Sequence, residues 1–167
     1  TVTLSLTSSD PGEGTVAPAS MIFTAANWNV AQTATVTGVD DAIDDGNIAY
    51  SVTLGSSGDA TYAALAQPVA TVLLTNNDDA DTAGVTASAA SGATTEAGGT
   101  ATFTVELDTE PVDTVTLSLT SSDPGEGTVS PASMLFTSAN WNVAQTATVT
   151  GVDDSIDDGP VAYSVTL

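Results

Sequence analysis

The sequence contains no lysine, arginine or histidine, although 21 of its 167 residues are aspartate or glutamate. Nucleic-acid binding depends on Lys and Arg contacts to phosphate, so this class of function is excluded. A polybasic anchor for an acidic membrane surface is excluded for the same reason. Solvent, salt ions or a bound metal must therefore balance every carboxylate, because the chain has no cationic side chain.

Cysteine is absent too, which is typical of an exported bacterial protein that does not depend on disulfides. Without His, Cys and Lys the chain lacks the base or nucleophile of Ser-His, Cys-His and Schiff-base mechanisms. It also lacks the thiolate and imidazole ligands of zinc. Paired carboxylates can hydrolyse glycosides, but the short loops indicate no deep pocket. We therefore expect no enzymatic activity.

Long apolar runs are also missing, since none approaches the length of a membrane span, and we expect no direct membrane insertion. Hydrophobic residues nevertheless make up 41% of the chain. They are mainly Val, Ala, Leu and Ile set among Thr and Ser. This composition can bury a core.

The chain contains an internal repeat. Residues 1–54 recur at 114–167 without a gap, so the offset is 113 residues. A unit of this size is close to an immunoglobulin-like domain of roughly 100 residues. Six pairs of positions differ, and they are Ala17/Ser130, Ile22/Leu135, Ala25/Ser138, Ala42/Ser155, Asn47/Pro160 and Ile48/Val161.

Alternation of apolar and hydroxyl side chains predicts an all-β fold. In TVTLSLT (1–7), Val2, Leu4 and Leu6 share one face, which is the period of a half-buried strand. Seven such segments per 113-residue repeat favour tandem immunoglobulin-like two-sheet sandwiches. The segments are 1–7, 20–24, 33–39, 48–54, 68–75, 84–89 and 99–107.

The repeat register divides the chain into two parts. Residues 1–81 hold the last five strands of one repeat, and residues 82–167 hold the first six strands of the next. Either a longer polypeptide or a neighbouring chain would supply the remaining strands, the latter by edge addition.

The densest acidic stretch is GVDDAIDDG (38–46), which returns as GVDDSIDDG (151–159). Two carboxylates about 4 Å apart repel by up to ~4 kcal/mol at an effective dielectric constant of about 20. A divalent cation reverses this effect. Calcium accepts about six to eight oxygen ligands in irregular geometry, whereas magnesium demands a stricter octahedron. The loop therefore indicates a Ca²⁺ site, and the alternative is a solvated anionic surface.

The spacing is not that of an EF-hand. Alignment of Asp41 with the first loop position places Ile43 at a ligand position and Val52 where the final glutamate is required. The loop thus needs ligands from elsewhere. The other acidic loops are NNDDAD (76–81), TTEAGG (94–99) with Glu96, and SSDPGEG (8–14 and 121–127) with Asp10, Glu13, Asp123 and Glu126.

The order TEAGGTATFTVEL, VTGVDDxIDDG and TNNDDADTAG resembles the Calx-β module, and more closely the Calx-β-like tandem repeats of large secreted bacterial adhesins. The most specific part of the resemblance is ANWN…QTATVTGVDD, and the resemblance covers essentially the whole chain. The family binds calcium at one end of an immunoglobulin-like sandwich, near the junction with the next domain.

The resemblance implies a ligand set for each copy. The first copy would use Asp10, Asp40, Asp41, the Ile43 carbonyl, Asp45, Asp78 and Asp79. The second copy would use Glu96, Asp123, Asp153, Asp154, the Ile156 carbonyl and Asp158. The family's further glutamates after the acidic loop are replaced here by Gly46, Asn47 and Ile48, which implies fewer or weaker ions.

Two tryptophans lie in the NWN motifs, Trp28 and Trp141. An exposed indole could stack on a sugar ring, but so few aromatic residues in a chain of this length more often pack into a core. We expect both side chains in the core.

These inferences predict a non-catalytic, calcium-stabilised repeat of a secreted bacterial surface adhesin, an extracellular spacer whose partners are adjacent repeats. One alternative is a subunit of a self-assembling extracellular fibre, in which identical neighbouring chains donate strands. Another is a carbohydrate- or ice-binding module, which the threonine-rich strands only faintly suggest.

Overall fold

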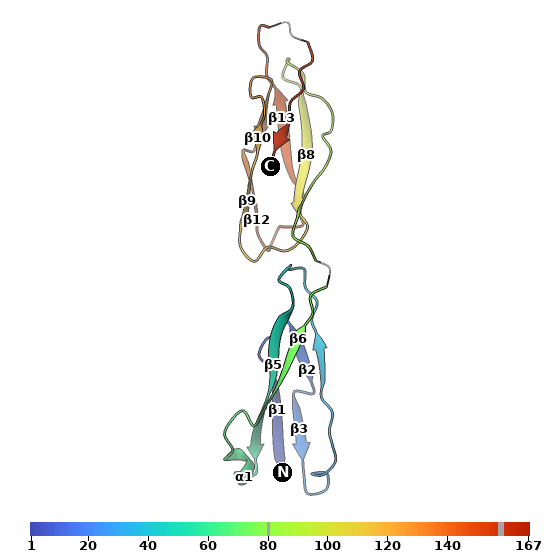
Figure 1. The fold of residues 1–167 in the computed structure, drawn as a ribbon, viewed down its shortest axis with the longest axis vertical. Helices are drawn as coiled ribbons and strands as arrows, with labels where there is room; N and C mark the ends of the chain where they lie inside the picture. The colour runs from blue at the N-terminus through green and yellow to red at the C-terminus, as the bar shows by residue number, and fades with distance from the viewer. Residues whose placement is uncertain (80, 157–158) are drawn as a thin grey trace. The chain divides into compact units, whose positions relative to one another are not determined.

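The fold is all-β, in a computed structural model that describes residues 1–79, 81–156 and 159–167. The chain divides into two compact units (Figure 1). Unit 1 comprises Thr1–Asp41 and Asp45–Ala80, and unit 2 comprises Ala42–Asp44 and Asp81–Leu167.

Unit 1 has one sheet of four antiparallel strands in the order β3-β1-β5-β6 and a separate antiparallel pair, β2 and β4. In the first sheet Leu6 lies opposite Leu54, and Val52 lies opposite Val72. The strands are β1 (Val2–Ser8), β2 (Gly14–Ala17), β3 (Ser20–Phe23), β4 (Thr35–Gly38), β5 (Ile48–Gly58) and β6 (Ala70–Asn76).

The core of unit 1 is small. It consists of the buried side chains Leu6, Met21 and Val52, with half-buried apolar side chains from β1 to β6 packed around them. Tyr50 is buried as well, and its ring lies against Gly14, where any side chain would collide with it. The start of β5 is thereby held against the start of β2.

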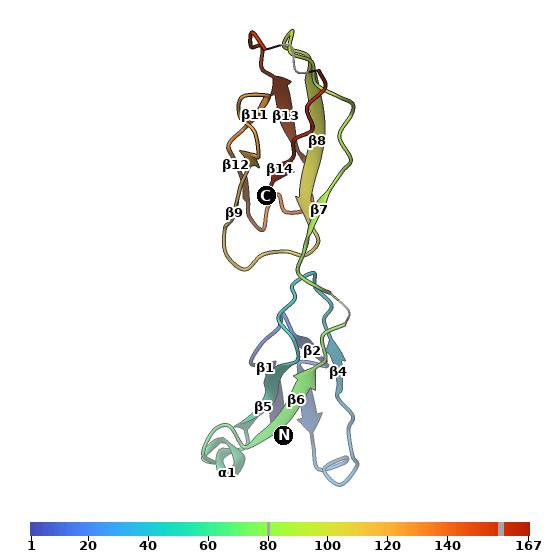
Figure 2. The ribbon, with the colours of Figure 1, turned by 45° about the horizontal axis from the view of Figure 1, so that its top comes forward.

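Unit 2 has a four-stranded antiparallel sheet in the order β11-β13-β8-β7 and two antiparallel pairs, β12 with β9 and β10 with β14 (Figure 2). The strands are β7 (Val85–Ala87), β8 (Thr100–Leu107), β9 (Val115–Ser118), β10 (Thr120–Ser121), β11 (Gly127–Ser130), β12 (Ser133–Phe136), β13 (Gln145–Gly151) and β14 (Val165–Thr166).

Strand β8 shows why these sequences form half-buried strands. In TATFTVEL every second residue is buried, and the alternate residues are Thr or Glu. The apolar face meets β9, β12 and β13 in one core. The members of this core are Phe103, Val105, Leu107, Leu119, Met134, Phe136, Ala147 and Val149.

Each of the seven predicted segments contains a strand, but β2 and its counterpart β11 were missed. They follow the SSDPGEG turn directly and are four residues long, too short for a period to be recognised. β5 also continues through residues 55–58, beyond the end of the predicted segment 48–54. There the main chain pairs with β1, and such pairing requires no apolar side chain.

A single helical turn, α1 (Ala60–Ala63), follows β5. Its N-cap is Asp59, whose side chain accepts hydrogen bonds from the N–H groups of Thr61 and Tyr62. Among the described residues no helix has the length and apolar character needed to cross a membrane.

Trp141 packs against the core of unit 2, as expected. Trp28 does not, and the expectation of core packing is wrong for this residue, since its side chain is 71% exposed. In unit 2 the Trp141 carbonyl accepts a hydrogen bond from Leu107 N–H at the end of β8. The described part of unit 1 has no strand equivalent to β8 beside Trp28.

Candidate metal centre

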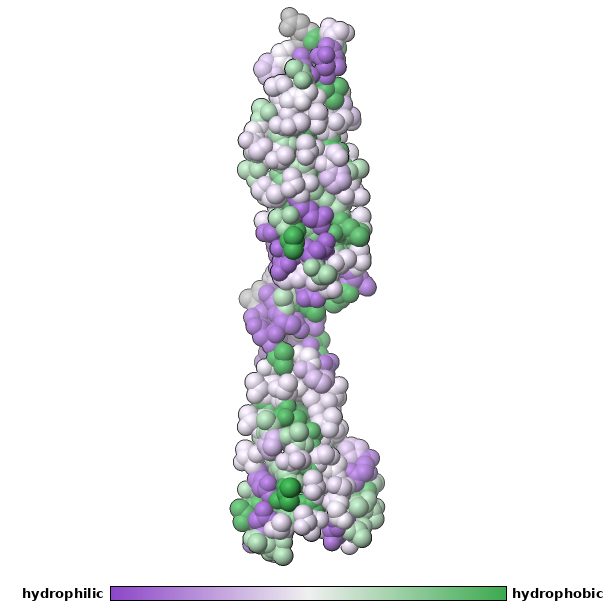
Figure 3. Space-filling view, turned by 180° about the vertical axis from the view of Figure 1, so that it is seen from behind, coloured by the Kyte–Doolittle hydropathy of each residue, from purple (hydrophilic) through white to green (hydrophobic). Residues whose placement is uncertain are grey.

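An acidic cavity of about 190 Å³ lies at one end of unit 1. Three loops form it: the turn before β2, the loop after β4 and the segment after β6. In the space-filling view, hydrophilic residues gather at this end of unit 1 (Figure 3). The carboxylates that line the cavity belong to Glu13, Asp40, Asp41, Asp45, Asp78 and Asp79.

Amide side chains hold these loops together where no cationic side chain is available. Asn76, the last residue of β6, donates hydrogen bonds from Nδ2 to the Val39 carbonyl (2.6 Å) and to Glu13 Oε2 (3.2 Å). Val39 N–H in turn donates to the Glu13 carbonyl (3.0 Å). The neutral side chain of Asn76 thereby joins all three loops.

Two glycines shape the loop after β4. Gly46 has φ +74°, a conformation that side chains other than glycine's rarely adopt, and it reverses the chain after the acidic run. At Gly38 a Cβ atom would lie 2.5 Å from Asn76 Oδ1, so the close approach of Asn76 requires glycine here. Asn47 Oδ1 accepts a hydrogen bond from Asp78 N–H (3.0 Å), which fixes the start of the third loop.

The arrangement suits a hard cation. Six carboxylates and the amide side chains of Asn76 and Asn77 surround the cavity, and these are the oxygen ligands that Ca²⁺ and Mg²⁺ accept. The chain offers no counter-charge of its own, because it has no Lys, Arg or His. Without a cation, the carboxylates repel one another across the cavity.

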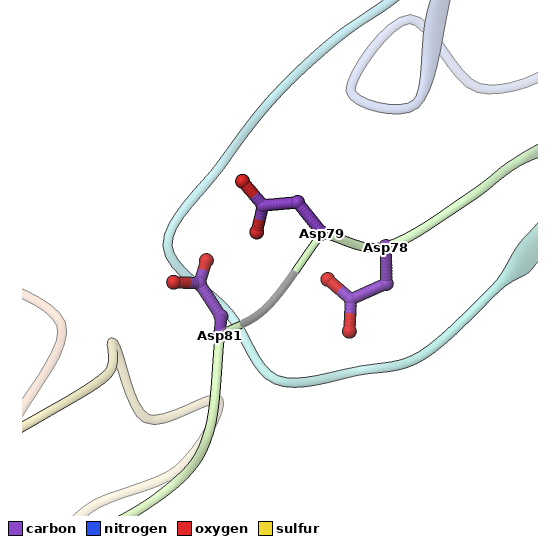
Figure 4. Close-up of side chains that lie close together, drawn as sticks. All are labelled: Asp78, Asp79 and Asp81. Atoms are coloured by element: carbon purple, nitrogen blue, oxygen red, sulfur yellow. The ribbon is translucent and has the colours of Figure 1, made fainter.

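Three aspartates also lie close together on one short segment, of which Asp78 and Asp79 belong to unit 1 and Asp81 to unit 2 (Figure 4). One carboxylate oxygen from each of Asp78, Asp79 and Asp81 lies within 4.8 Å of the other two. Two oxygens that bind the same Ca²⁺ at about 2.3–2.6 Å can be at most about 5.2 Å apart. This group could therefore hold a metal ion, and it is the only such group of three among the described residues.

The structure brings together most of the ligands predicted for the first copy. Asp40, Asp41, Asp45, Asp78 and Asp79 line the acidic cavity. Ile43 is not among the lining residues. Neither is Asp10, whose Oδ1 accepts a hydrogen bond from Gly12 N–H (3.1 Å) within its own turn.

Glu13 was present among the acidic side chains of the SSDPGEG turn, but the family resemblance selected Asp10. The signal that could have identified Glu13 is its place immediately before β2. There its main chain pairs with Val39 and its side chain reaches Asn76. Asn76 was missed altogether, because an amide among aspartates carries no charge signal.

In unit 2 the predicted ligands are dispersed. Asp123 Oδ1 accepts a hydrogen bond from Gly125 N–H (3.1 Å), and Asp154 Oδ1 accepts one from Ile156 N–H (2.7 Å). Asp153 is exposed, and Ile156 is 63% exposed. Glu96 lines a different, largely apolar cavity. Asp158 lies outside the described residues.

No protein-family model, curated protein or solved structure matches this chain.

Proposed function

We propose that the chain consists of tandem immunoglobulin-like repeats that resemble the Calx-β module and bind Ca²⁺ in the acidic cavity of unit 1. The observation that carries this proposal is the convergence of six carboxylates from three loops in a chain without any cationic side chain. The donor set contains only hard oxygen ligands. These ligands come from three loops and need not form a regular octahedron, so they suit calcium, which accepts irregular geometry, better than magnesium.

The proposed role is structural and non-catalytic. Ca²⁺ would neutralise the three loops, stiffen the repeat and make it a spacer in a secreted bacterial surface adhesin. Extracellular calcium modules bind at about 10⁻⁴ to 10⁻³ M, so such a site is filled outside the cell and empty in the cytosol. The resemblance to adhesin repeats supports an extracellular location, where a site in this affinity range would be filled.

Calorimetric titration of the chain with Ca²⁺, and separately with Mg²⁺, tests the proposal. We expect Ca²⁺ to bind more tightly and to raise the midpoint of thermal unfolding, and EGTA to reverse the shift. The variant Asp45→Asn should weaken binding, because Asp45 lines the cavity. The matched control Asp113→Asn removes one charge from an exposed position outside it and should leave binding unchanged. Identical curves with Ca²⁺ and with EGTA would refute calcium binding.

A second candidate function is a subunit of a self-assembling extracellular fibre, in which neighbouring chains share strands. The observation in its favour is an open, largely apolar cavity of about 940 Å³ in unit 2, lined by Phe103, Tyr163 and Val165 among others. Sedimentation of the purified chain over a range of concentrations tests this candidate, which predicts assemblies that grow with concentration.

A further inference from the structure

The dipeptide Asp45–Gly46, in the loop after β4, combines two groups that can react with each other. In an Asp-Gly sequence the main-chain nitrogen of the glycine can attack the side-chain carboxyl of the aspartate, because glycine has no Cβ atom to hinder the approach. Two aspartates of the chain precede a glycine, Asp45 and Asp158. Asp158 lies outside the described residues, so the structural argument concerns Asp45.

Both reacting groups of Asp45–Gly46 are free of hydrogen bonds to other described residues. The Asp45 side chain is exposed, and its carboxylate accepts no hydrogen bond from any residue that the structure describes. Among the same residues, the Gly46 N–H has no acceptor. Apart from its chain neighbours, no heavy atom lies within 4 Å of the position that a Gly46 Cβ atom would take. The carboxyl group and the nitrogen can therefore approach each other.

The other aspartates in the described part of the chain lack this combination. Asp10 and Asp123 precede proline, whose nitrogen carries no hydrogen and cannot close an imide ring. Asp44 Oδ2 accepts a hydrogen bond from Ala83 N–H (2.9 Å), which holds this carboxylate in place. Each aspartate that does not precede proline precedes a residue whose side chain hinders the attack. Asp45 is thus singled out by its neighbour and by its surroundings.

We propose that Asp45–Gly46 is a site of isoaspartate formation, and that a cation in the acidic cavity protects it. In the first step Gly46 N bonds to Asp45 Cγ, the amide proton and the carboxyl hydroxyl leave as water, and a five-membered succinimide ring forms. In the second step one water opens the ring at either of its two C–N bonds. One opening restores aspartate, and the other yields isoaspartate. The water lost and the water gained cancel, so the reaction is an isomerisation.

A bound cation acts on the same carboxylate. Asp45 lines the acidic cavity, and a carboxylate oxygen that binds Ca²⁺ at about 2.3–2.6 Å is free neither to leave as water nor to rotate toward Gly46 N. In the empty cavity the exposed side chain keeps this rotation. The protection rests on the proposed function, whereas the reaction in the empty cavity does not depend on it.

Isoaspartate at residue 45 would damage the calcium site. It adds one carbon atom to the main chain before Gly46 and shortens the side chain that carries the carboxylate by one carbon atom. The next residue is Asn47, whose Oδ1 accepts the hydrogen bond from Asp78 N–H (3.0 Å) that fixes the third loop of the cavity. A chain kept without the cation should therefore lose its calcium binding with time, whereas a filled chain should keep it.

Prolonged incubation of the full-length chain at physiological temperature and pH, in EGTA or in saturating Ca²⁺, tests the proposal. Chymotrypsin then releases residues 29–50 as one peptide, because it cleaves after Trp28 and Tyr50 and no other aromatic residue, leucine or methionine lies between them. Isoaspartyl methyltransferase labels isoaspartate in this peptide, and electron-transfer fragmentation locates it among the four aspartates. We expect isoaspartate at Asp45 to accumulate several times faster in EGTA than in Ca²⁺.

Two glycine variants separate the reaction from other effects of ageing. In Gly46→Asn the new Cβ atom hinders the attack, and asparagine tolerates a positive φ better than most residues. The matched control is Gly98→Asn, because Gly98 has φ +80° in equally open surroundings but follows an alanine. Unfolding curves verify that both variants fold. After incubation in EGTA, calorimetric titration should show calcium binding lost from the wild type and from Gly98→Asn in proportion to their isoaspartate, and retained in Gly46→Asn.

The proposal is overturned if isoaspartate in EGTA is no more abundant at Asp45 than at the other three aspartates of the peptide. Equal accumulation at Asp45 in EGTA and in Ca²⁺ would overturn it as well, because protection is part of it. Titration of the freshly prepared chain with Ca²⁺ then separates the causes. If Ca²⁺ binds, the protection alone is wrong, and if Ca²⁺ does not bind, the proposed function fails too.

Discussion

Residues 1–54 and 114–167 are nearly identical in sequence, yet the structure places their side chains in different environments. Locally the two copies agree closely: Thr24 N–H and Thr137 N–H each donate to an asparagine Oδ1 at 2.6 Å. Burial does not agree. Ala147 is 0% exposed and lies opposite Phe103 of the neighbouring strand β8, whereas Ala34, the same residue of the repeat, is only half-buried.

The cause of the difference is strand pairing over long sequence distances. β13 is flanked by β11 and β8, whereas β4, whose residues TVTG are those that end β13, pairs only with β2 in the described part of the chain. In the other sheet, β5 is flanked by β1 and β6, while its counterpart in unit 2 pairs with β10 over Val165–Thr166. The local hydrogen bonds thus follow from the sequence that the two copies share, whereas the burial of their side chains depends on strands outside the repeated residues.

The largest expected effect comes from the core aromatic residue of each copy. Phe136 is 0% exposed, so Phe136→Ala should destabilise unit 2 by about 3–5 kcal/mol. Phe23 is its counterpart and is half-buried, so Phe23→Ala should cost about half as much or less. Denaturant unfolding, followed by the fluorescence of the tryptophan in each unit, measures both losses of stability. Equal losses would mean that the two cores are equally packed and would break the comparison.

The next largest difference in stability between the two units should come from calcium binding. If its concentration exceeds the dissociation constant about 100-fold, one bound ion stabilises unit 1 by about 2.7 kcal/mol. Asp40→Asn should reduce this gain, by about 1.4 kcal/mol for each tenfold loss of affinity. In EGTA the same substitution should raise the stability of unit 1, because it removes repulsion in the acidic cavity.

The matched variant is Asp153→Asn, at the same position of the repeat in unit 2, where the residue is exposed. We expect it to leave the calcium-dependent shift of unit 1 unchanged in thermal unfolding. A loss of calcium binding as large as that of Asp40→Asn would place the ion in unit 2 instead.

A smaller effect is expected at Asn76. Its side chain joins Val39 to Glu13, so Asn76→Ala should cost about 1–2 kcal/mol in unit 1 and weaken calcium binding. The neighbouring Asn77 makes no hydrogen bond to another described residue, so Asn77→Ala should change stability by less than about 0.5 kcal/mol. Unfolding curves and calorimetry of the two variants check this prediction. An effect of Asn77→Ala as large as that of Asn76→Ala would contradict it.

Replacement of Trp28 should have the smallest effect on stability and a clear effect on fluorescence. Trp28 is 71% exposed, so Trp28→Phe should change stability by less than about 0.5 kcal/mol. The remaining Trp141 should then emit at shorter wavelength and resist quenching by acrylamide, whereas Trp28 in the Trp141→Phe variant should be quenched readily. Similar quenching of the two single-tryptophan variants would show that both indoles have the same environment.

Much of the fold was predictable from the sequence. Alternation in TVTLSLT and TATFTVEL identified β1 and β8, because a period of two residues is a local property of a half-buried strand. The candidate site was predictable in part. Asp40, Asp41 and Asp45 form one dense run, and charge density is visible in a sequence. Glu13 was a candidate by its charge but was not in the implied ligand set, and Asn76 was not predicted, because their role depends on the distance between loops.

By itself the sequence determined the all-β character, the repeat and the need for a counter-cation, since these depend on composition, periodicity and charge. Only the tertiary structure decided which acidic side chains meet. Asp40 and its repeat counterpart Asp153 are both exposed, but the structure brings Asp40 together with Asp78 at the acidic cavity. The physical reason is that burial and charge proximity depend on which strands are neighbours, and a neighbour such as β6 or β8 lies outside the repeated residues that it covers.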